Sequence, residues 1–233
     1  MKRPLIGIIG KNQPQYGEDI WHRIDETDEI RYLIVKHGGT AIMLLPTQKT
    51  LHFNDNDIKD DTVLSEEELK ELYRQIDLCD GFILQGGLYS SKYEVEMAKR
   101  IIELDKPLIG ICAGFNNILR AIGTDVIEDK TDSHNIYDAN YRHDIRIMKN
   151  TKIYEYAQKE DYQVNSIHSM MAPIDKVEGY ATISSVSYDG FVESIELKGK
   201  RFVIGVKWHP ELMLEDPITK GLMDDFISEC NKK

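Results

Sequence analysis

The stretch Lys106-Pro-Leu-Ile-Gly-Ile-Cys-Ala-Gly-Phe-Asn-Asn-Ile-Leu-Arg-Ala-Ile-Gly123 decides the fold of this chain. Its apolar run at 108–111 is typical of a buried strand. The following apolar residues recur at i, i+3, i+4 and i+7, which predicts a helix that ends at Gly123. Cys112 therefore lies at a strand-to-helix corner, with Gly110 and Gly114 two residues to either side.

A corner of this kind exposes its middle side chain at the carboxyl end of a strand, as the nucleophile elbow of hydrolases does. The helix that follows directs free N–H groups and the positive end of its dipole at the sulfur, which lowers the pKa of a thiol. The alternative is a buried cysteine without a chemical role. This stretch alone leaves both interpretations open.

The rest of the chain continues the alternation of strands and helices. Buried strands are expected at 5–9, 40–45 and 81–84, and helices at 23–37, after the capping box Ser65-Glu-Glu-Glu68, and at 94–104. Polar loops are expected at 11–16 and 54–61. This order predicts a parallel sheet, because each strand is followed by a crossover helix.

The second half of the chain has a different pattern. Apolar and polar residues alternate at 144–148, and a hairpin is expected around Ser187-Tyr-Asp-Gly190. A buried strand at 202–206 and a helix after Pro217 complete the chain. We therefore expect one α/β domain over 1–233, with a doubly wound, mostly parallel central sheet, flanking helices and a smaller antiparallel segment in the C-terminal half.

Composition narrows the classes of function. The 233 residues are 41% hydrophobic and 30% charged, and their formal net charge of −11 disfavours nucleic acid or an anionic membrane as a partner. Three cysteines without a C-x-x-C spacing suggest free thiols in a reducing compartment. With neither a signal peptide nor a transmembrane-length run in the sequence, we expect a cytoplasmic protein.

A nucleophilic cysteine needs a base, and His209 has the most suitable position among the seven histidines. It follows the strand at 202–206, so it also lies at the carboxyl end of a strand. Glu211 stands two residues on and can hold one nitrogen of the imidazole while the other faces the thiol. The other histidines in loops or at element ends are expected at the surface: His22, His52, His134 and His143.

Two motifs together resemble a known family. Gly-Ile-Cys-Ala-Gly at 110–114 and Gly205-Val-Lys-Trp-His-Pro-Glu211 are similar to the class I glutamine amidotransferases, and within them to the γ-glutamyl-γ-aminobutyrate hydrolase branch of the C26 cysteine peptidases. The resemblance extends from Leu5 to about Phe226. Further matches are Pro4-Leu-Ile-Gly-Ile, Ile83-Leu-Gln-Gly-Gly87, Val164-Asn-Ser-Ile-His168 and Asp189-Gly-Phe-Val-Glu193.

The resemblance implies a flavodoxin-like fold and a reaction without a cofactor or a metal. Cys112 would attack the γ-carbonyl of a γ-glutamyl amide, His209 would relay the proton, and Glu211 would orient His209. The backbone N–H groups of Gly87 and Ala113 would form the oxyanion hole. The residues implied in substrate binding are Gly86, Asn116, Asn165, Ser166 and His168.

The sequence differs from that branch around the substrate. Ala113 replaces an arginine and Asn116 a glutamine, while Ser169 and Met170 stand in place of a second histidine and a glutamine. The expected partner is a small γ-glutamyl substrate, and the identity of its amine is left open. The polar loop at 124–140, which includes His134 and Asp138, is expected to face solvent and to hold no metal.

Two other functions share these motifs. One is a glutaminase subunit that delivers ammonia to a partner synthetase, because the chain has no Gly-x-x-x-x-Gly-Lys-Ser/Thr nucleotide loop of its own. The other is a catalytically inactive, ligand-binding relative. A homodimer is compatible with the sequence, but no apolar stripe in it argues for one.

Overall fold

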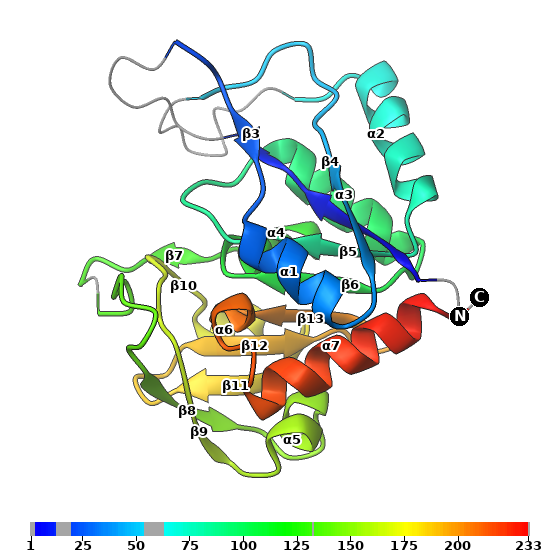
Figure 1. The fold of residues 1–233 in the computed structure, drawn as a ribbon. Coiled ribbons are helices and arrows are strands. Elements are labelled where there is room, and N and C mark those ends of the chain that lie inside the picture. The colour runs from blue at the N-terminus through cyan, green and yellow to red at the C-terminus, as the bar shows by residue number, and fades with distance from the viewer. Residues whose placement is uncertain (1–2, 13–19, 54–62, 132, 233) are drawn as a thin grey trace.

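The computed structural model describes residues 3–12, 20–53, 63–131 and 133–232. Their main element is one nine-stranded sheet, which runs through the whole molecule (Figure 1). Five neighbouring strands pair in parallel: β4 (Thr40–Leu44), β1 (Leu5–Ile9), β5 (Gly81–Leu84), β6 (Leu108–Ile111) and β13 (Val203–Val206). Four antiparallel strands extend the sheet beyond β13: β12 (Val192–Glu196), β11 (Thr182–Ser187), β8 (His143–Ile147) and β9 (Asp161–Val164).

Helices cover both faces of the sheet, and each face has its own apolar core. The first face is packed by α1 (Asp28–Lys36), α5 (Lys152–Ala157) and α7 (Pro217–Cys230). The second is packed by α2 (Glu66–Leu78), α3 (Lys92–Glu103), α4 (Ala113–Ala121) and α6 (Ile174–Val177). The predicted fold class is confirmed, since this is a doubly wound α/β sheet with an antiparallel extension in its C-terminal half.

Short elements outside the main sheet shape its carboxyl edge. Two ladders of two strands each join β2 (Lys11–Asn12) to β3 (Ile24–Asp25) and β7 (Ile127–Glu128) to β10 (Met170–Met171). The 3-10 helix η2 (Pro210–Leu212) begins directly after His209.

The corner between β6 and α4 is as sharp as the sequence predicts. Cys112 has φ 52° and ψ −103°, a conformation that a side-chain-bearing residue rarely adopts. Position 114, two residues after Cys112, accepts only glycine. A Cβ at Gly114 would lie 2.0 Å from the Leu84 carbonyl oxygen. A Cβ at Gly110 would lie 2.7 Å from the carbonyl oxygen of Gly114. The two glycines thus let α4 pack directly against the strands that carry it.

Some expected elements have different bounds. The helix expected from residue 23 begins at Asp28, because residues 24–25 pair in the ladder with β2. The strand expected to be buried at 40–45 is the edge strand β4, and its Ile42 and Met43 are exposed. The short helices α5 and α6 were not predicted. The loops expected at 11–16 and 54–61 lie mostly outside the described residues.

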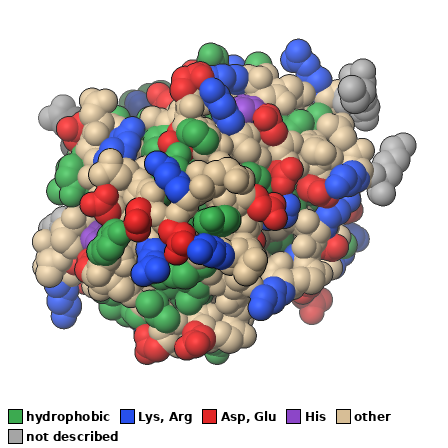
Figure 2. All heavy atoms as spheres, turned by 90° about the horizontal axis from the view of Figure 1, so that it is seen from below, with side chains coloured by type: hydrophobic (Ala, Val, Ile, Leu, Met, Phe, Trp, Pro, Cys, Tyr) green, Lys and Arg blue, Asp and Glu red, His purple; other side chains and the backbone are tan. Residues whose placement is uncertain are grey.

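The charged side chains on the described surface are of both signs. On the face shown in Figure 2, acidic and basic side chains are intermixed, and the basic ones form no continuous patch among the described residues. None of the helices in the described part of the chain combines the length and apolar character needed to cross a membrane.

Candidate active site

Cys112 and His209 follow two neighbouring parallel strands. The last residue of β6, Ile111, pairs with the last residue of β13, Val206, so both strands end at the same level of the sheet. Gly86 lies between the two side chains: a Cβ built on it would be 2.7 Å from His209 Cε1 and 3.4 Å from Cys112 Cβ. The topology therefore brings together the predicted nucleophile, the predicted base and the glycine loop.

His209 is oriented by Glu211. Its Nδ1 lies 2.7 Å from Glu211 Oε1, and since a carboxylate only accepts, Nδ1 carries the proton. His209 Nε2 has no hydrogen-bond partner among the described residues, which leaves it available to the thiol. The Glu211 side chain is buried, so its charge acts on the imidazole with little screening by water.

The pKa values of Cys112 and His209 favour an ion pair. Burial alone would raise the pKa of the Cys112 thiol, but the neighbouring His209 and Lys207 lower it to about 7. Burial likewise opposes protonation of His209, yet Glu211 and Cys112 raise its pKa well above the ordinary value. Burial raises the pKa of Cys79 to about 11, and it also raises that of Cys230. Cys112 is thus the one of the three cysteines whose pKa is lowered.

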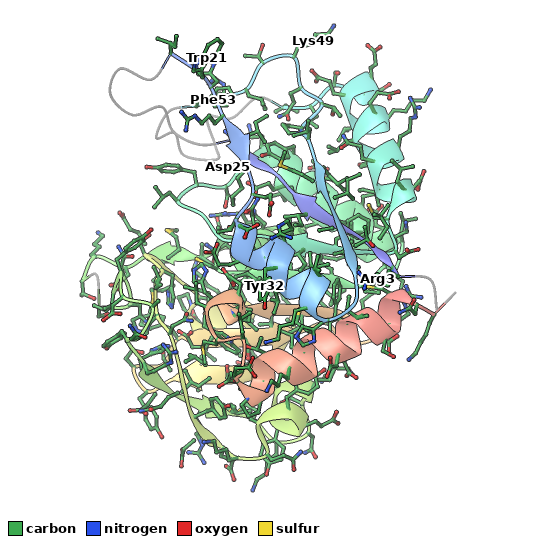
Figure 3. The ribbon with its side chains drawn as sticks, viewed as in Figure 1. Arg3, Trp21, Asp25, Tyr32, Lys49 and Phe53 are labelled. Carbon is green, nitrogen blue, oxygen red and sulfur yellow. The ribbon has the colours of Figure 1, made fainter. Side chains whose placement is uncertain are left out.

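A cavity of about 1010 Å³ opens in front of Cys112 and His209. Its lining contains the expected residues Gly86, Gly87, Ala113, Asn116 and His168. Ala113 is the first residue of α4, so its N–H has no partner within the helix. The exposed Asp25, which also lines this cavity, is the last residue of β3 and precedes α1 (Figure 3).

Asn165 and Ser166, expected at the substrate, are not among the described residues that line this cavity. Asn165 is fully buried behind His209: its Nδ2 donates to the His209 carbonyl and its Oδ1 accepts from the His209 N–H, each at 2.8 Å. Ser166 donates to the backbone carbonyl of His134. Asn165 therefore holds the backbone of the predicted base.

Sequence reasoning missed several buried side chains that support residues of the cavity lining. Lys207 is fully buried and donates to Asn116 Oδ1 at 3.0 Å. Lys11 and Glu94 form a buried ion pair of 2.6 Å, and Lys11 also donates to the Tyr89 carbonyl, just beyond the glycine loop. An apolar environment around a lysine is visible in the sequence Ile-Gly-Val-Lys207-Trp, but its partner is not.

The expectation that His134 faces solvent is wrong. Its side chain is buried, and His143 is largely buried beside it, with ring centroids 5.0 Å apart. Burial of His168 together with the charge of Lys207 lowers the pKa of that imidazole to about 4. His134, His143 and His168 form a cluster, of which His168 alone lines the cavity of Cys112 among the described residues.

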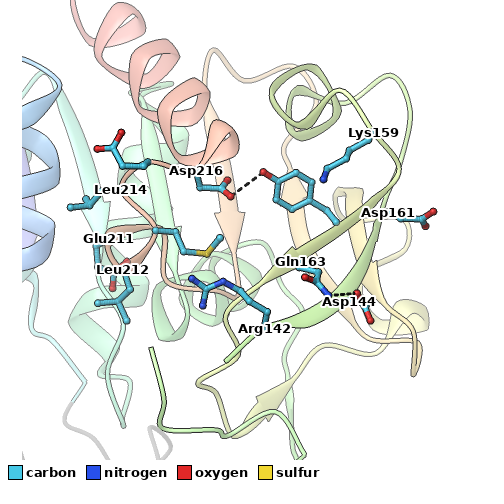
Figure 4. A pocket seen from close by; sticks show the side chains of 12 residues that line it. Arg142, Asp144, Lys159, Asp161, Gln163, Glu211, Leu212, Leu214 and Asp216 are labelled. Atoms are coloured by element: carbon cyan, nitrogen blue, oxygen red, sulfur yellow. Dashed lines mark hydrogen bonds between the residues drawn. The ribbon is translucent and has the colours of Figure 1, made fainter. Parts of the chain in front are cut away.

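A second cavity of about 880 Å³ lies on the other side of Glu211 (Figure 4). It is lined by residues of β8, β9 and the segment that leads into α7, and the Tyr162 hydroxyl donates a hydrogen bond to Asp216 at 2.9 Å. Cys112 and His209 do not line it, so the larger cavity is the candidate active site.

Several known proteins are similar to this chain in sequence or in fold. NtpR of Enterococcus hirae is 27% identical over 63% of this chain and 65% of its own length, just under two thirds. The glutamine amidotransferase-like protein YvdE of Lactococcus lactis is 24% identical over 91% of this chain and 92% of its own. The γ-glutamyl-γ-aminobutyrate hydrolase PuuD of Escherichia coli is 24% identical over 53% of this chain and 54% of its own.

Among solved structures, a glutamine amidotransferase from Thermotoga maritima covers 100% of this chain and of its own with a TM-score of 0.62 at 14% identity, which supports the fold. The Peptidase C26 family profile matches residues 88–211, which include Cys112, His209 and Glu211. The chain belongs to the Peptidase C26 family, within the class I glutamine amidotransferase-like superfamily.

Proposed function

We propose that this chain is a cysteine-dependent hydrolase that cleaves the γ-glutamyl amide bond of a small γ-glutamyl amine. The observation that carries the proposal is the arrangement of Cys112, His209 and Glu211 at one end of the large cavity, with the pKa of the thiol lowered to about 7. The name of PuuD as a γ-glutamyl-γ-aminobutyrate hydrolase supports the bond type.

The first half of the reaction forms a thioester. The Cys112 thiolate attacks the γ-carbonyl carbon, and the carbonyl electrons move to its oxygen. The N–H groups of Ala113 and Gly87 stabilise this oxyanion, and one such donor is worth about 3–4 kcal/mol of barrier. His209 gives the proton on Nε2 to the amine nitrogen as the C–N bond breaks, so the amine leaves neutral at that step.

The second half consumes water. His209, now neutral, takes a proton from a water molecule through Nε2, and the resulting hydroxide attacks the thioester carbon. The C–S bond breaks, glutamate leaves, and the thiolate and imidazolium are restored. Glu211 keeps Nδ1 protonated in both halves, so that Nε2 remains the nitrogen that exchanges protons.

The γ-glutamyl group would occupy the part of the cavity nearest Cys112. Asn116 and His168 line this part, and Lys207 holds the Oδ1 of Asn116 from behind. The amide Nδ2 of Asn116 is then the donor turned to a substrate carboxylate. Asn165 acts as a positioning residue, because it contacts His209 rather than the cavity.

Release of glutamate from a panel of γ-glutamyl amines and from glutamine tests the proposal. The purified chain should hydrolyse at least one γ-glutamyl amine, and Cys112→Ala should lower the rate by about 10⁴-fold or more. Intact-mass analysis of the quenched reaction should find a γ-glutamyl adduct on Cys112. Absence of glutamate release across the panel, with the chain folded, would contradict the proposal.

A glutaminase subunit remains the second candidate, favoured by the match to YvdE over nearly the whole of both chains. Under this alternative the isolated chain would be slow on γ-glutamyl amines, and its activity on glutamine would rise when a synthetase binds. A catalytically inactive relative would show neither activity, and its Cys112 would react slowly with alkylating reagents near neutral pH.

A further inference from the structure

Three histidines from separate segments converge on one glutamate at the antiparallel end of the sheet. Glu193 lies in β12, His143 begins β8, and His134 and His168 lie in the segments before β8 and after β9. The Glu193 side chain has no exposed surface, and those of His134 and His143 are 5% and 12% exposed. The cluster is thus enclosed by protein.

The facing atoms in this cluster lack hydrogen bonds. Both carboxylate oxygens of Glu193, Nδ1 of His134 and Nε2 of His143 have no hydrogen-bond partner in the described part of the chain. His134 Nδ1 lies 3.7 Å from Oε1, and His143 Nε2 lies 3.6 Å from Oε2. These separations are too long for hydrogen bonds, and a buried carboxylate with two unsatisfied oxygens is costly.

The tautomer of His134 makes a direct contact with Glu193 still less favourable. His134 Nε2 lies 2.9 Å from Asp189 Oδ2, and since the carboxylate only accepts, Nε2 carries the proton in the neutral imidazole. Asp189 is held in turn by the hydroxyl of Ser187. His134 Nδ1 then directs a lone pair at Glu193 Oε1, which also carries lone pairs. A cation between Nδ1 and Oε1 would accept electron pairs from both atoms and remove their repulsion.

We propose that His134 Nδ1, His143 Nε2 and the Glu193 carboxylate bind a divalent cation of the zinc class. Their donor atoms all lie within 4.8 Å of one another. Tetrahedral zinc with bonds of about 2.0–2.1 Å separates its ligand atoms by about 3.4 Å. The separations from His134 Nδ1 and His143 Nε2 to the Glu193 carboxylate, 3.7 and 3.6 Å, are close to this value. The donors suit zinc, and the bond from His134 to Asp189 is the carboxylate–histidine contact that orients metal-bound imidazoles.

His168 stands next to this set. Its Nε2 lies 3.6 Å from Glu193 Oε1 but also 3.5 Å from Ser166 Oγ, so we assign it no metal bond. His168 also lines the active-site cavity, and the residues after His134, namely Asn135, Tyr137 and Ala139, line it as well. A cation held here would fasten that wall of the cavity to β8 and β12, so its role is structural.

Metal content of the untagged protein, purified without chelating resin from zinc-supplemented cells, tests the proposal. Inductively coupled plasma mass spectrometry should find about one zinc per chain. Glu193→Gln and His134→Asn should lose it. His37→Asn should keep it, because His37 pairs with Asp224 on another side of the molecule. Cys112→Ser should also keep it, which excludes binding at the predicted nucleophile.

A second measurement keeps the proposal testable if a variant folds poorly. Wild-type protein stripped with a chelator should regain Tm when zinc is added back, because a ligand that binds only the folded state stabilises it. Cobalt should give the visible absorption of a four-coordinate ion. Glu193→Gln should show neither response. Substoichiometric metal in the wild-type protein, together with no Tm response to zinc or cobalt, would overturn the proposal.

Discussion

The ammonium of Lys207 donates a hydrogen bond at 3.0 Å to Oδ1 of Asn116, which lines the active-site cavity, and both side chains are buried. Burial lowers the pKa of Lys207, while the nearby Cys112 and Glu193 oppose that shift. The same charge helps to lower the pKa of the Cys112 thiol. Lys207 thus links the substrate side of the cavity to the nucleophile.

Lys207→Met is expected to raise the thiol pKa and to raise KM for a γ-glutamyl substrate. The thiolate loses a nearby positive charge, and Asn116 loses the donor that holds its amide in place. The pH midpoint of Cys112 alkylation and the separate kcat and KM values measure both effects. Lys106→Met is the matched control, since Lys106 binds carbonyls of Ile76 and Cys79 at the other end of the sheet. An unchanged midpoint and KM in Lys207→Met would contradict this prediction.

Alkylation at neutral pH should modify Cys112 alone. As the pH rises through about 7, the Cys112 thiol loses its proton and the rate of alkylation should rise with it. Cys79, whose pKa is raised to about 11, and Cys230 are buried and should remain unmodified in the folded protein. Peptide mapping after iodoacetamide at several pH values measures this. Equal labelling of all three cysteines without unfolding would rule the prediction out.

Asn165→Ala should lower kcat by about 10- to 100-fold and change KM little, because a small displacement of a catalytic group is costly. The substitution removes both bonds that fix the His209 backbone. Asn117→Ala is the control: Asn117 is equally buried but is bonded to Arg120 on α4. Steady-state kinetics on the γ-glutamyl amine with the highest kcat/KM measures kcat and KM of both variants. An equal loss of kcat in both would point to a general packing defect and contradict the prediction.

Much of the neighbourhood of Cys112 could be predicted because it depends on contiguous residues. The apolar run before Cys112, the glycines around it and the helical spacing after it are all local, and parallel pairing then sets His209 beside it. Strand β4 shows the limit of such patterns. An apolar run such as that at 40–45 is compatible with a central strand and with an edge strand. Only the order of strands in the sheet shows that β4 is at the edge and that its Ile42 is exposed.

The contacts that could not be predicted all join distant segments. Asn165 meets His209 only because the segment after β9 returns to the end of β13, 44 residues away in sequence. His143 and Glu193 meet because β8, β11 and β12 are neighbours in the sheet, and His134 joins them because its segment is bonded to the one that follows β9. The polar surroundings of His134 in the sequence are typical of a surface loop, and nothing local distinguishes that loop from one folded over a buried carboxylate.

The exposed part of the active-site cavity is acidic, which should influence the charge that the enzyme prefers on the leaving amine. Burial, with the nearby charge of Asp28, raises the pKa of the Glu26 carboxyl, and the other acidic residues there are exposed. The only lysine or arginine among the described lining residues is Arg120, and its guanidinium is paired with Asp125. The carboxylates of the outer cavity are Asp25, Glu26, Glu29 and Glu128.

A γ-glutamyl amine with a free ammonium on its leaving group should therefore be hydrolysed with a kcat/KM about 10-fold above that of the γ-aminobutyrate conjugate, which carries a carboxylate there. The ratio should fall as salt rises, since exposed charges are screened. Glu29→Gln combined with Glu128→Gln should reduce it, whereas Glu71→Gln on the outer face of α2 should not. Competition between the two conjugates at low and high ionic strength measures the ratio, and equal rates at low salt would show that the rim carboxylates do not select the amine.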